Sequence, residues 1–207
     1  MVVSRHVRDA RRNRERILNA ASELMSEHGF AGATIAAICK KADVMAPTLY
    51  WHFGDKEGLV VAVMERAASR WFEEFVPAEG VDPTGPPRET LNALFRERPE
   101  FLRLSLLLAL ERRDPNSQAR AAVERFRERA KQSWSRALEG LLAGIKSAKK
   151  RRAAADRLSD FLLMQIDGAF IACQLHPDRA DVDTFWRLTQ VAIRAAADEL
   201  IRDLQRS

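Results

Sequence analysis

Residues 34–56 read TIAAICKKADVMAPTLYWHFGDK, and this stretch decides the expected fold of the chain. Thr34 is a suitable N-cap, because its hydroxyl can accept a hydrogen bond from a free amide of the first helical turn. Asp43 falls where the chain must turn, and aspartate tolerates the left-handed backbone conformation. Pro47 suits the first position of a second short helix, which would end near His52. Two short helices joined by a tight turn predict a helix-turn-helix that reads DNA.

The composition favours an all-α protein. Apolar residues make up 46% of the chain and charged residues 30%, as in soluble globular proteins. Only nine glycines and eight prolines occur, and no alternating apolar pattern is long enough to predict a strand. The expected architecture is an N-terminal three-helix helix-turn-helix domain in residues 1–56, followed by a C-terminal helical domain in residues 57–207.

Apolar spacing and helix-breaking residues predict the order of the other helices. The first should span residues 8–28 and stop at Gly29, and the helix after the helix-turn-helix should begin at Asp55 and reach residue 75. Prolines and glycines predict a loop over residues 76–87. Further helices are expected near residues 88–97, from 99, and over 115–142, 153–176 and 182–204. The basic run at 149–152 is either a phosphate-binding patch or a solvated connection between helices, and we favour the connection.

Positive charge is concentrated at the N-terminus. The net charge of +5 permits nucleic-acid binding but is weak support for it. Residues 1–16 contain two acidic residues, Asp9 and Glu15. The same segment carries six arginines: Arg5, Arg8, Arg11, Arg12, Arg14 and Arg16. This basic arm, residues 1–16, would either lie on DNA phosphates and in the minor groove or serve as a frayed, solubilising terminus.

The sequence disfavours enzymes, metal proteins and membrane proteins. Cys39 and Cys173 lack a metal-binding spacing, and the four histidines are too scattered for an acid–base site, so no enzyme activity, metal or cofactor is expected. Residues 101–110 are apolar but about half as long as a membrane span, and they contain Arg103. The arginine-rich start is not a signal peptide. We therefore expect a cytoplasmic protein that makes no contact with membranes.

The last two helices are expected to form a homodimer interface. They are rich in alanine and apolar on more than one side, which requires burial on two sides. A two-fold four-helix bundle would provide that burial, and paired recognition helices need a two-fold partner. The alternative is that these helices complete the core of one subunit. The expected interface residues are Leu162, Ala169, Cys173, Phe185, Trp186, Thr189, Ala192 and Ala196.

Residues 16–64 resemble the TetR family of transcriptional regulators. The similar segments are the HGF that ends the first helix, TIAAICKKA and PTLYWHFGDKEGLV. The run TLYWHF is more similar to tetracycline-type repressors than to the general family pattern. Beyond residue 76 only the architecture is similar. The resemblance implies a C-terminal ligand-binding and dimerisation domain, and a repressor that a small-molecule effector releases from a palindromic operator. The alternative is a helical, dimeric interaction or ligand-binding protein without operator binding.

The resemblance also implies a set of DNA-contacting residues. Thr34 and Lys56 match phosphate-binding positions, and Tyr50 and His52 match positions that contact the DNA backbone. Base edges would be approached by Pro47, Thr48 and Trp51, with Ala36 and Ala46 at positions where many members carry longer polar side chains. The alternatives are that Thr34 only caps its helix, that His52 caps the end of the next one, and that Tyr50 or Trp51 packs on the first helix.

Two departures from the family pattern affect how DNA would be read. Asp43 replaces the usual glycine of the turn, which is expected to shift the recognition helix slightly. Ala36 and Ala46 remove hydrogen bonds to bases, each worth about 1–3 kcal/mol of discrimination. We therefore expect this chain to depend more on methyl contacts, DNA shape and the basic arm.

A ligand site is the least defined expectation. Its candidate residues are Trp71, Phe101, Leu104, Leu108, Trp134, Leu138, Phe161, Gln165, Asp167 and Phe170. Gln165 and Asp167 are the most interesting, because polar groups in an apolar helix can orient a ligand. The alternative is that most of these side chains are core and that Asp167 lies at an interface. An apolar or aromatic effector is weakly preferred.

Overall fold

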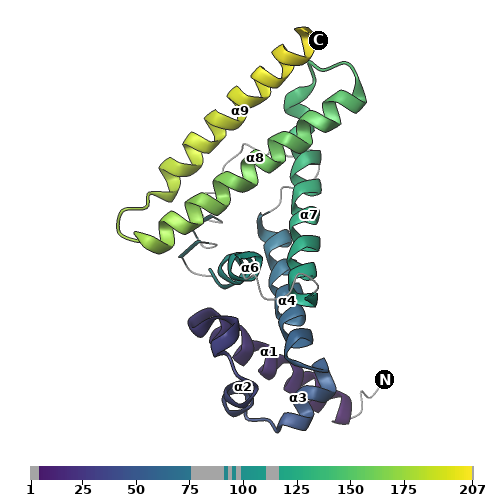
Figure 1. The fold of residues 1–207 in the computed structure, drawn as a ribbon, viewed down its shortest axis with the longest axis vertical. Helices are drawn as coiled ribbons and strands as arrows, with labels where there is room; N and C mark the ends of the chain where they lie inside the picture. The colour runs from purple at the N-terminus through teal and green to yellow at the C-terminus, as the bar shows by residue number, and fades with distance from the viewer. Residues whose placement is uncertain (1–4, 76–90, 93–94, 97–98, 111–116, 207) are drawn as a thin grey trace. The chain divides into compact units, whose positions relative to one another are not determined.

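The computed structural model describes residues 5–75, 91–92, 95–96, 99–110 and 117–206 (Figure 1). Their helices are α1 (Arg5–Gly32), α2 (Ile35–Ala42), α3 (Ala46–Phe53), α4 (Lys56–Phe75), α6 (Glu100–Leu110), α7 (Gln118–Leu138), the short 3₁₀ helix η2 (Glu139–Leu142), α8 (Ala148–Leu175) and α9 (Val182–Arg206). No strand occurs in the described part of the chain, and the all-α prediction is confirmed. The loop expected at 76–87, most of the helix expected at 88–97 and the helix start expected at 115 lie outside the described residues.

The contacts divide the chain into two compact units. One contains residues 1–70 and 100–125, and the other contains residues 71–99 and 126–207. The division falls inside α4 and α7, and it groups α6 with the first three helices. This grouping differs from the boundary expected at residue 56.

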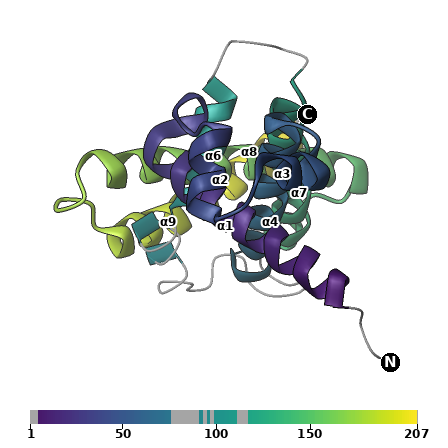
Figure 2. The same cartoon turned by 90° about the horizontal axis from the view of Figure 1, so that it is seen from below.

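The first unit is organised around α1, which packs against α2, α3 and α6. Ile17, Leu18 and Met25 recur on one face of α1 and are fully buried. At Gly29 the helix leaves helical geometry, with φ 70°, a region that glycine enters without the penalty of a Cβ. Arg103 on α6 donates to the carbonyl oxygen of Ser26 at 3.2 Å and ties α6 to this end of α1. Figure 2 shows the first turns of α1 (purple) extending beyond α2.

The second unit is built on α8 and α9, which lie side by side. Three side chains of the second half of α7 bond to carboxylates of α8. Arg127 pairs with Asp167 at 2.7 Å, Lys131 pairs with Asp160 at 2.6 Å, and the Ser135 hydroxyl donates to Asp156 at 2.6 Å. These pairs hold α7 and α8 in one register.

The basic run at 149–152 belongs to the first turns of α8 and is not a connection between helices. Ser147 caps this helix by accepting from the Lys150 amide at 3.4 Å. Arg151 donates to Glu139 at 3.1 Å and to the Ile145 carbonyl oxygen at 3.0 Å. That arginine therefore joins η2 to α8, which leaves it engaged within the protein.

Among the described helices, α8 alone is long and apolar enough to meet a length-and-composition criterion for crossing a membrane. It also carries Asp156, Asp160 and Asp167, which bond to α7. We therefore interpret α8 as a helix that packs on α7 within the second unit, and not as a membrane span.

Candidate nucleic-acid interface

The first helix of the helix-turn-helix begins at an exposed hydroxyl. Thr34 has extended backbone geometry, and its Oγ1 accepts a hydrogen bond from the Ala37 amide at 3.2 Å. This bond satisfies one of the free amides at the start of α2, as the sequence predicted. It uses Oγ1 as an acceptor only, so the hydroxyl hydrogen can be donated to an acceptor in the solvent or on DNA.

The turn between α2 and α3 is left-handed. Asp43 has φ 50° and ψ 54°, and the Val44 amide donates to the Cys39 carbonyl oxygen at 3.1 Å. Arg16 of α1 donates through Nη2 to both the carbonyl oxygen of Asp43, at 2.8 Å, and its Oδ2, at 2.7 Å. Residue 43 therefore adopts the geometry expected of a glycine while it is held by a side chain 27 residues earlier.

Recognition helix α3 is anchored on one side and open on the other. Leu49 is fully buried, whereas Trp51 is 74% exposed and Tyr50 and Pro47 are also exposed. Thr48 and His52 are half-buried. A single buried leucine thus fixes the helix and directs a mixed aromatic and hydroxyl surface outward.

Four other residues lie near the recognition helix, and their exposure differs. Ala36 is exposed on α2, and Ala46 is half-buried at the start of α3. Phe53 is half-buried, and the Arg14 guanidinium lies 5.6 Å from its ring centroid. Met45, the residue before α3, is 75% exposed and was missed. An exposed methionine so close to the turn adds an apolar contact to this surface.

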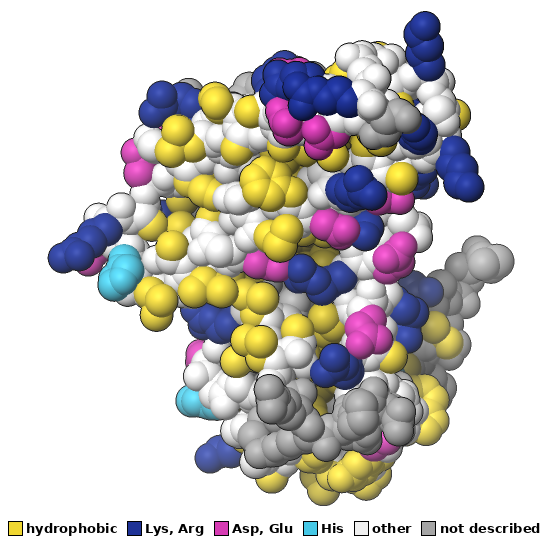
Figure 3. All heavy atoms as spheres, turned by 45° about the horizontal axis from the view of Figure 1, so that its top comes forward, with side chains coloured by type: hydrophobic (Ala, Val, Ile, Leu, Met, Phe, Trp, Pro, Cys, Tyr) yellow, Lys and Arg dark blue, Asp and Glu magenta, His cyan; other side chains and the backbone are white. Residues whose placement is uncertain are grey.

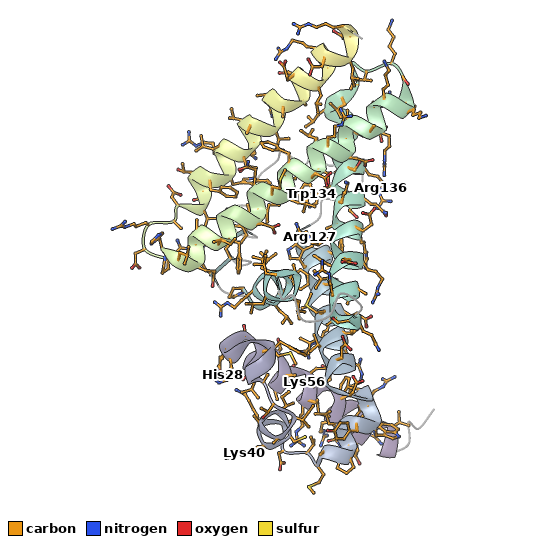
Figure 4. All side chains as sticks on the ribbon, in the orientation of Figure 1. His28, Lys40, Lys56, Arg127, Trp134 and Arg136 are labelled. Atoms are coloured by element: carbon orange, nitrogen blue, oxygen red, sulfur yellow. The ribbon has the colours of Figure 1, made fainter. Side chains whose placement is uncertain are left out.

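The Lys56 ammonium group is already engaged within the protein, whereas the resemblance implied that it binds a DNA phosphate. Its Nζ donates to the Phe30 carbonyl oxygen at 2.6 Å and lies 4.4 Å from the Phe30 ring centroid. It therefore ties the start of α4 to the end of α1. Figure 4 labels Lys56. Lys40, in the last turn of α2, is exposed and is a cation that the sequence analysis did not select.

An open hollow of about 400 Å³ lies between α1 and α3. Its lining comes from both helices: Asp9, Ala10, Asn13, Pro47, Thr48, Trp51 and His52. Asp9 and Asn13 were missed, because the basic arm was considered only for its charge. Their four-residue spacing on a helix was the available signal, since it places both on one face. The expected contact residues of α3 therefore share a surface with the start of α1.

His52 is electrostatically disfavoured as a cation in the free protein. Burial of its ring and, to a smaller extent, the nearby Arg14 charge lower its pKa from the ordinary value of 6.5. Its ring meets Trp51 edge to face, with centroids 4.6 Å apart. The imidazole is therefore mostly neutral at neutral pH, and a nearby anion would favour its protonation.

The expected ligand residues fall in both units. Phe101, Leu104 and Leu108 are buried in the first unit. In the second, Trp71, Trp134, Leu138 and Phe170 are buried, and Phe161, Gln165 and Asp167 are half-buried. Asp167 pairs with Arg127 at 2.7 Å, which supports a structural role for that carboxylate. The ligand site stays a prediction.

The expected interface residues differ in their exposure within one chain. Leu162, Cys173, Trp186 and Thr189 are buried. Ala169, Phe185, Ala192 and Ala196 are half-buried. Larger apolar side chains on the same two helices are more exposed, between 45% and 68%: Met164, Ile171 and Leu175 on α8 and Leu188 and Val191 on α9. The interface stays a prediction. Figure 3 shows apolar side chains (yellow) over α8 and α9.

No group of three histidine, cysteine, aspartate or glutamate side chains suited to a metal ion occurs among the described residues. Both cysteines are buried, and burial raises the pKa of each thiol from its ordinary value. Raised pKa values keep these thiols protonated and unreactive at neutral pH.

Comparison with known proteins places the helix-turn-helix in a family. A profile described as "Bacterial regulatory proteins, tetR family" matches residues 17–63. The transcriptional regulator UidR of Escherichia coli K12 is 46% identical over 77 residues, which is 35% of this chain and 38% of UidR. The class D tetracycline repressor of Escherichia coli is 38% identical over 71 residues, 34% of this chain and 33% of that repressor. The matches thus span well under half of these relatives.

Solved structures show that the likeness of fold extends beyond the matched segment. Salmonella enterica GusR aligns with a TM-score of 0.64 and 25% identity over 92% of this chain and 95% of its own. SmeT, solved in complex with triclosan, aligns with a TM-score of 0.65 and 22% identity over 89% and 90% of the two chains. The matched family and both relatives are described as regulators or repressors. The helix-turn-helix segment is therefore similar to the tetR family of bacterial regulatory proteins, and the fold of the chain is similar to those of the two solved structures.

Proposed function

We propose that this protein is a transcriptional regulator that binds a palindromic DNA operator as a homodimer and responds to a small-molecule effector. The observation that carries the proposal is α3, which is anchored by buried Leu49 and presents exposed Tyr50 and Trp51. A helix with this exposure fits the major groove, which distinguishes all four base pairs. Its place of action would be the cytoplasm, where bacterial DNA lies.

Positive charge around α3 supports DNA as the partner. On α1, Arg8, Arg11, Arg12 and Arg14 are exposed, and Lys40 is exposed on α2. Such side chains neutralise phosphates and release counterions, so the affinity should fall steeply with salt. Thr34 adds a neutral hydroxyl donor at the start of α2.

An exposed apolar face supports the homodimer. We call it the α8–α9 face: Met164, Ile171, Leu175, Leu188 and Val191. Along α8 three of these residues recur at helical spacing, and Leu188 and Val191 are three residues apart on α9. Contiguous exposed apolar surface commonly marks a protein–protein contact. A second copy of this chain is the partner that a palindromic operator requires.

The effector is supported by the relatives. One of the structures with a similar fold contains triclosan, and another relative is a tetracycline repressor. By analogy, an apolar or aromatic small molecule would bind the second unit of this chain. It could change operator affinity only by binding better to one of two conformations.

The test is a titration of the purified protein with DNA from around its own gene, at several salt concentrations. The expected result is a saturable complex whose affinity falls with salt. In a plot of log binding constant against log salt concentration, each neutralised phosphate should contribute about −0.9 to the slope. Binding that is weak and indifferent to DNA sequence would overturn the proposal. It would favour a helical, dimeric interaction or ligand-binding protein without operator binding.

Operator affinity is expected to increase as the pH falls from 7.5 to 5.5, a range we choose around the ordinary histidine value. In the free protein the pKa of His52 is lowered, whereas a DNA phosphate beside it would favour the charged imidazole. The complex therefore binds more protons than the free protein, and lower pH stabilises it. Fluorescence anisotropy at constant ionic strength measures this slope.

The matched pair of variants for this prediction is His52→Gln and His176→Gln. His176 is exposed at the end of α8 in the other unit. The first variant should flatten the pH dependence and the second should not; equal slopes in His52→Gln and the wild type would contradict the prediction. Folding has the opposite sign, because a lowered pKa stabilises the folded state above about pH 6.5 and less as the pH falls. Melting curves separate the two effects.

A further inference from the structure

The turn of the helix-turn-helix contains a strained residue. Among the described residues, Asp43 is the only non-glycine residue with positive φ. A Cβ makes the left-handed conformation unfavourable, although aspartate tolerates it better than most residues. A contact from outside the turn would therefore stabilise this geometry further.

Arg16 provides such a contact from α1. Its Nη2 donates to the Asp43 carbonyl oxygen at 2.8 Å and to Oδ2 at 2.7 Å, so it contacts both the backbone and the side chain of one residue. Arg16 is followed in α1 by Ile17 and Leu18, which are fully buried. The guanidinium therefore connects the turn to a part of the backbone that the core holds in place.

The direction of α3 depends on this turn. Helix α2 ends at Ala42, and α3 begins at Ala46, so only three residues set the angle between them. The Val44 amide donates to the Cys39 carbonyl oxygen at 3.1 Å, and this bond closes α2 only while residue 43 stays left-handed. A change of φ and ψ at this residue would rotate α3 and its exposed aromatic side chains.

We propose that Arg16 is a positioning residue: by holding Asp43 in the left-handed conformation, it sets the direction of the recognition helix. The effect on operator affinity rests on the proposed function, whereas the effect on the turn does not. The competing explanation is that Arg16 contacts a DNA phosphate directly, as the other arginines of α1 are expected to do.

A double-mutant cycle distinguishes these two roles. The four proteins are the wild type, Arg16→Ala, Asp43→Gly and the double variant. Glycine adopts a positive φ without assistance, so Asp43→Gly should bind the operator nearly as well as the wild type. Arg16→Ala alone should lose about 10-fold in affinity, within the range of couplings between contacting residues. In the Asp43→Gly background the same substitution should cost little.

An equal loss from Arg16→Ala in both backgrounds would overturn the proposal and assign Arg16 to a phosphate. Arg16→Lys gives a second criterion. Lysine keeps the charge for a phosphate, but its Nζ lies one bond nearer the backbone than Nη2. We therefore expect it to lose at least one of the two Asp43 contacts and to behave like alanine if Arg16 positions the turn. Wild-type behaviour of Arg16→Lys would also overturn the positioning role.

Hydrogen–deuterium exchange of residues 43–54 tests, without DNA, whether the Arg16 contact with Asp43 stabilises the turn and α3. The Thr48 amide donates to the Met45 carbonyl oxygen at 3.0 Å, and the Gly54 amide donates to that of Tyr50 at 2.8 Å, so these amides are protected. Their exchange should be faster in Arg16→Ala and should return toward the wild-type rate in the double variant. Unchanged exchange in Arg16→Ala would overturn the proposal.

The binding experiment and the exchange experiment test separate claims. If the wild type binds no operator but the exchange pattern is as expected, the proposed function fails and the positioning role stands. If Arg16→Ala does not fold, as judged by circular dichroism, the comparison is made with Arg16→Lys and Asp43→Asn. Asparagine also tolerates the left-handed region, so Asp43→Asn should reduce the loss caused by Arg16→Lys. No such reduction would overturn the positioning role.

Discussion

Val191→Asp is expected to convert the protein from dimer to monomer and to weaken operator binding by about 10²–10⁴-fold. Val191 is exposed on the α9 part of the α8–α9 face. In a two-fold interface the new carboxylate would occur twice and would lose its water on association, which is strongly unfavourable. The loss of affinity follows because the second recognition helix of a dimer binds at high effective concentration, whereas a monomer has no second helix.

Multi-angle light scattering gives the mass of each variant, and fluorescence anisotropy with an operator duplex gives its affinity. The control is Leu110→Asp, because Leu110 is 77% exposed at the end of α6, on another helix. Both substitutions place a carboxylate at an exposed apolar position, so folding should be affected little in either. If Val191→Asp remains dimeric and binds like Leu110→Asp, the α8–α9 face is not the interface.

The helix-turn-helix could be predicted because neighbouring residues determine it. Thr34 caps α2 through an amide three residues away, and Asp43 closes the same helix through a carbonyl oxygen three residues earlier. Each of these interactions lies within one helical turn, so spacing along the chain reveals it. The Arg16 contact with Asp43 spans 27 residues, and no local pattern indicates it.

In the C-terminal helices, by contrast, the sequence does not determine which side of a helix is buried. Helix α8 is apolar on two sides, and sequence periodicity identifies both without saying which one faces the protein's own core. The structure buries Leu162 and Cys173 on one side and exposes Met164 and Leu175 on the other. Asp167 was similarly ambiguous, because its partner Arg127 lies 40 residues earlier on another helix. Tertiary packing decides both assignments.

Trp51→Ala is expected to weaken operator binding at least about 10-fold and to leave the melting temperature unchanged. Because the side chain is 74% exposed, its removal creates no cavity. A good base contact contributes about 1–3 kcal/mol, and a dimer would lose two of them. The salt dependence of binding should not change, since tryptophan neutralises no phosphate; Arg12→Ala, by contrast, should reduce it.

The chemical identity of the Trp51 contact can be tested on the DNA. With alanines at positions 36 and 46, apolar contact with thymine methyl groups is the expected mode of base reading at this surface. Replacing thymine by uracil under α3 removes the methyl group and keeps the base-pairing edge. The wild type should bind uracil-containing operator more weakly, whereas Trp51→Ala should bind both duplexes equally, because the methyl group has already lost its partner. If uracil costs both proteins the same, Trp51 does not contact that methyl group, and its contribution must come from the sugar-phosphate backbone.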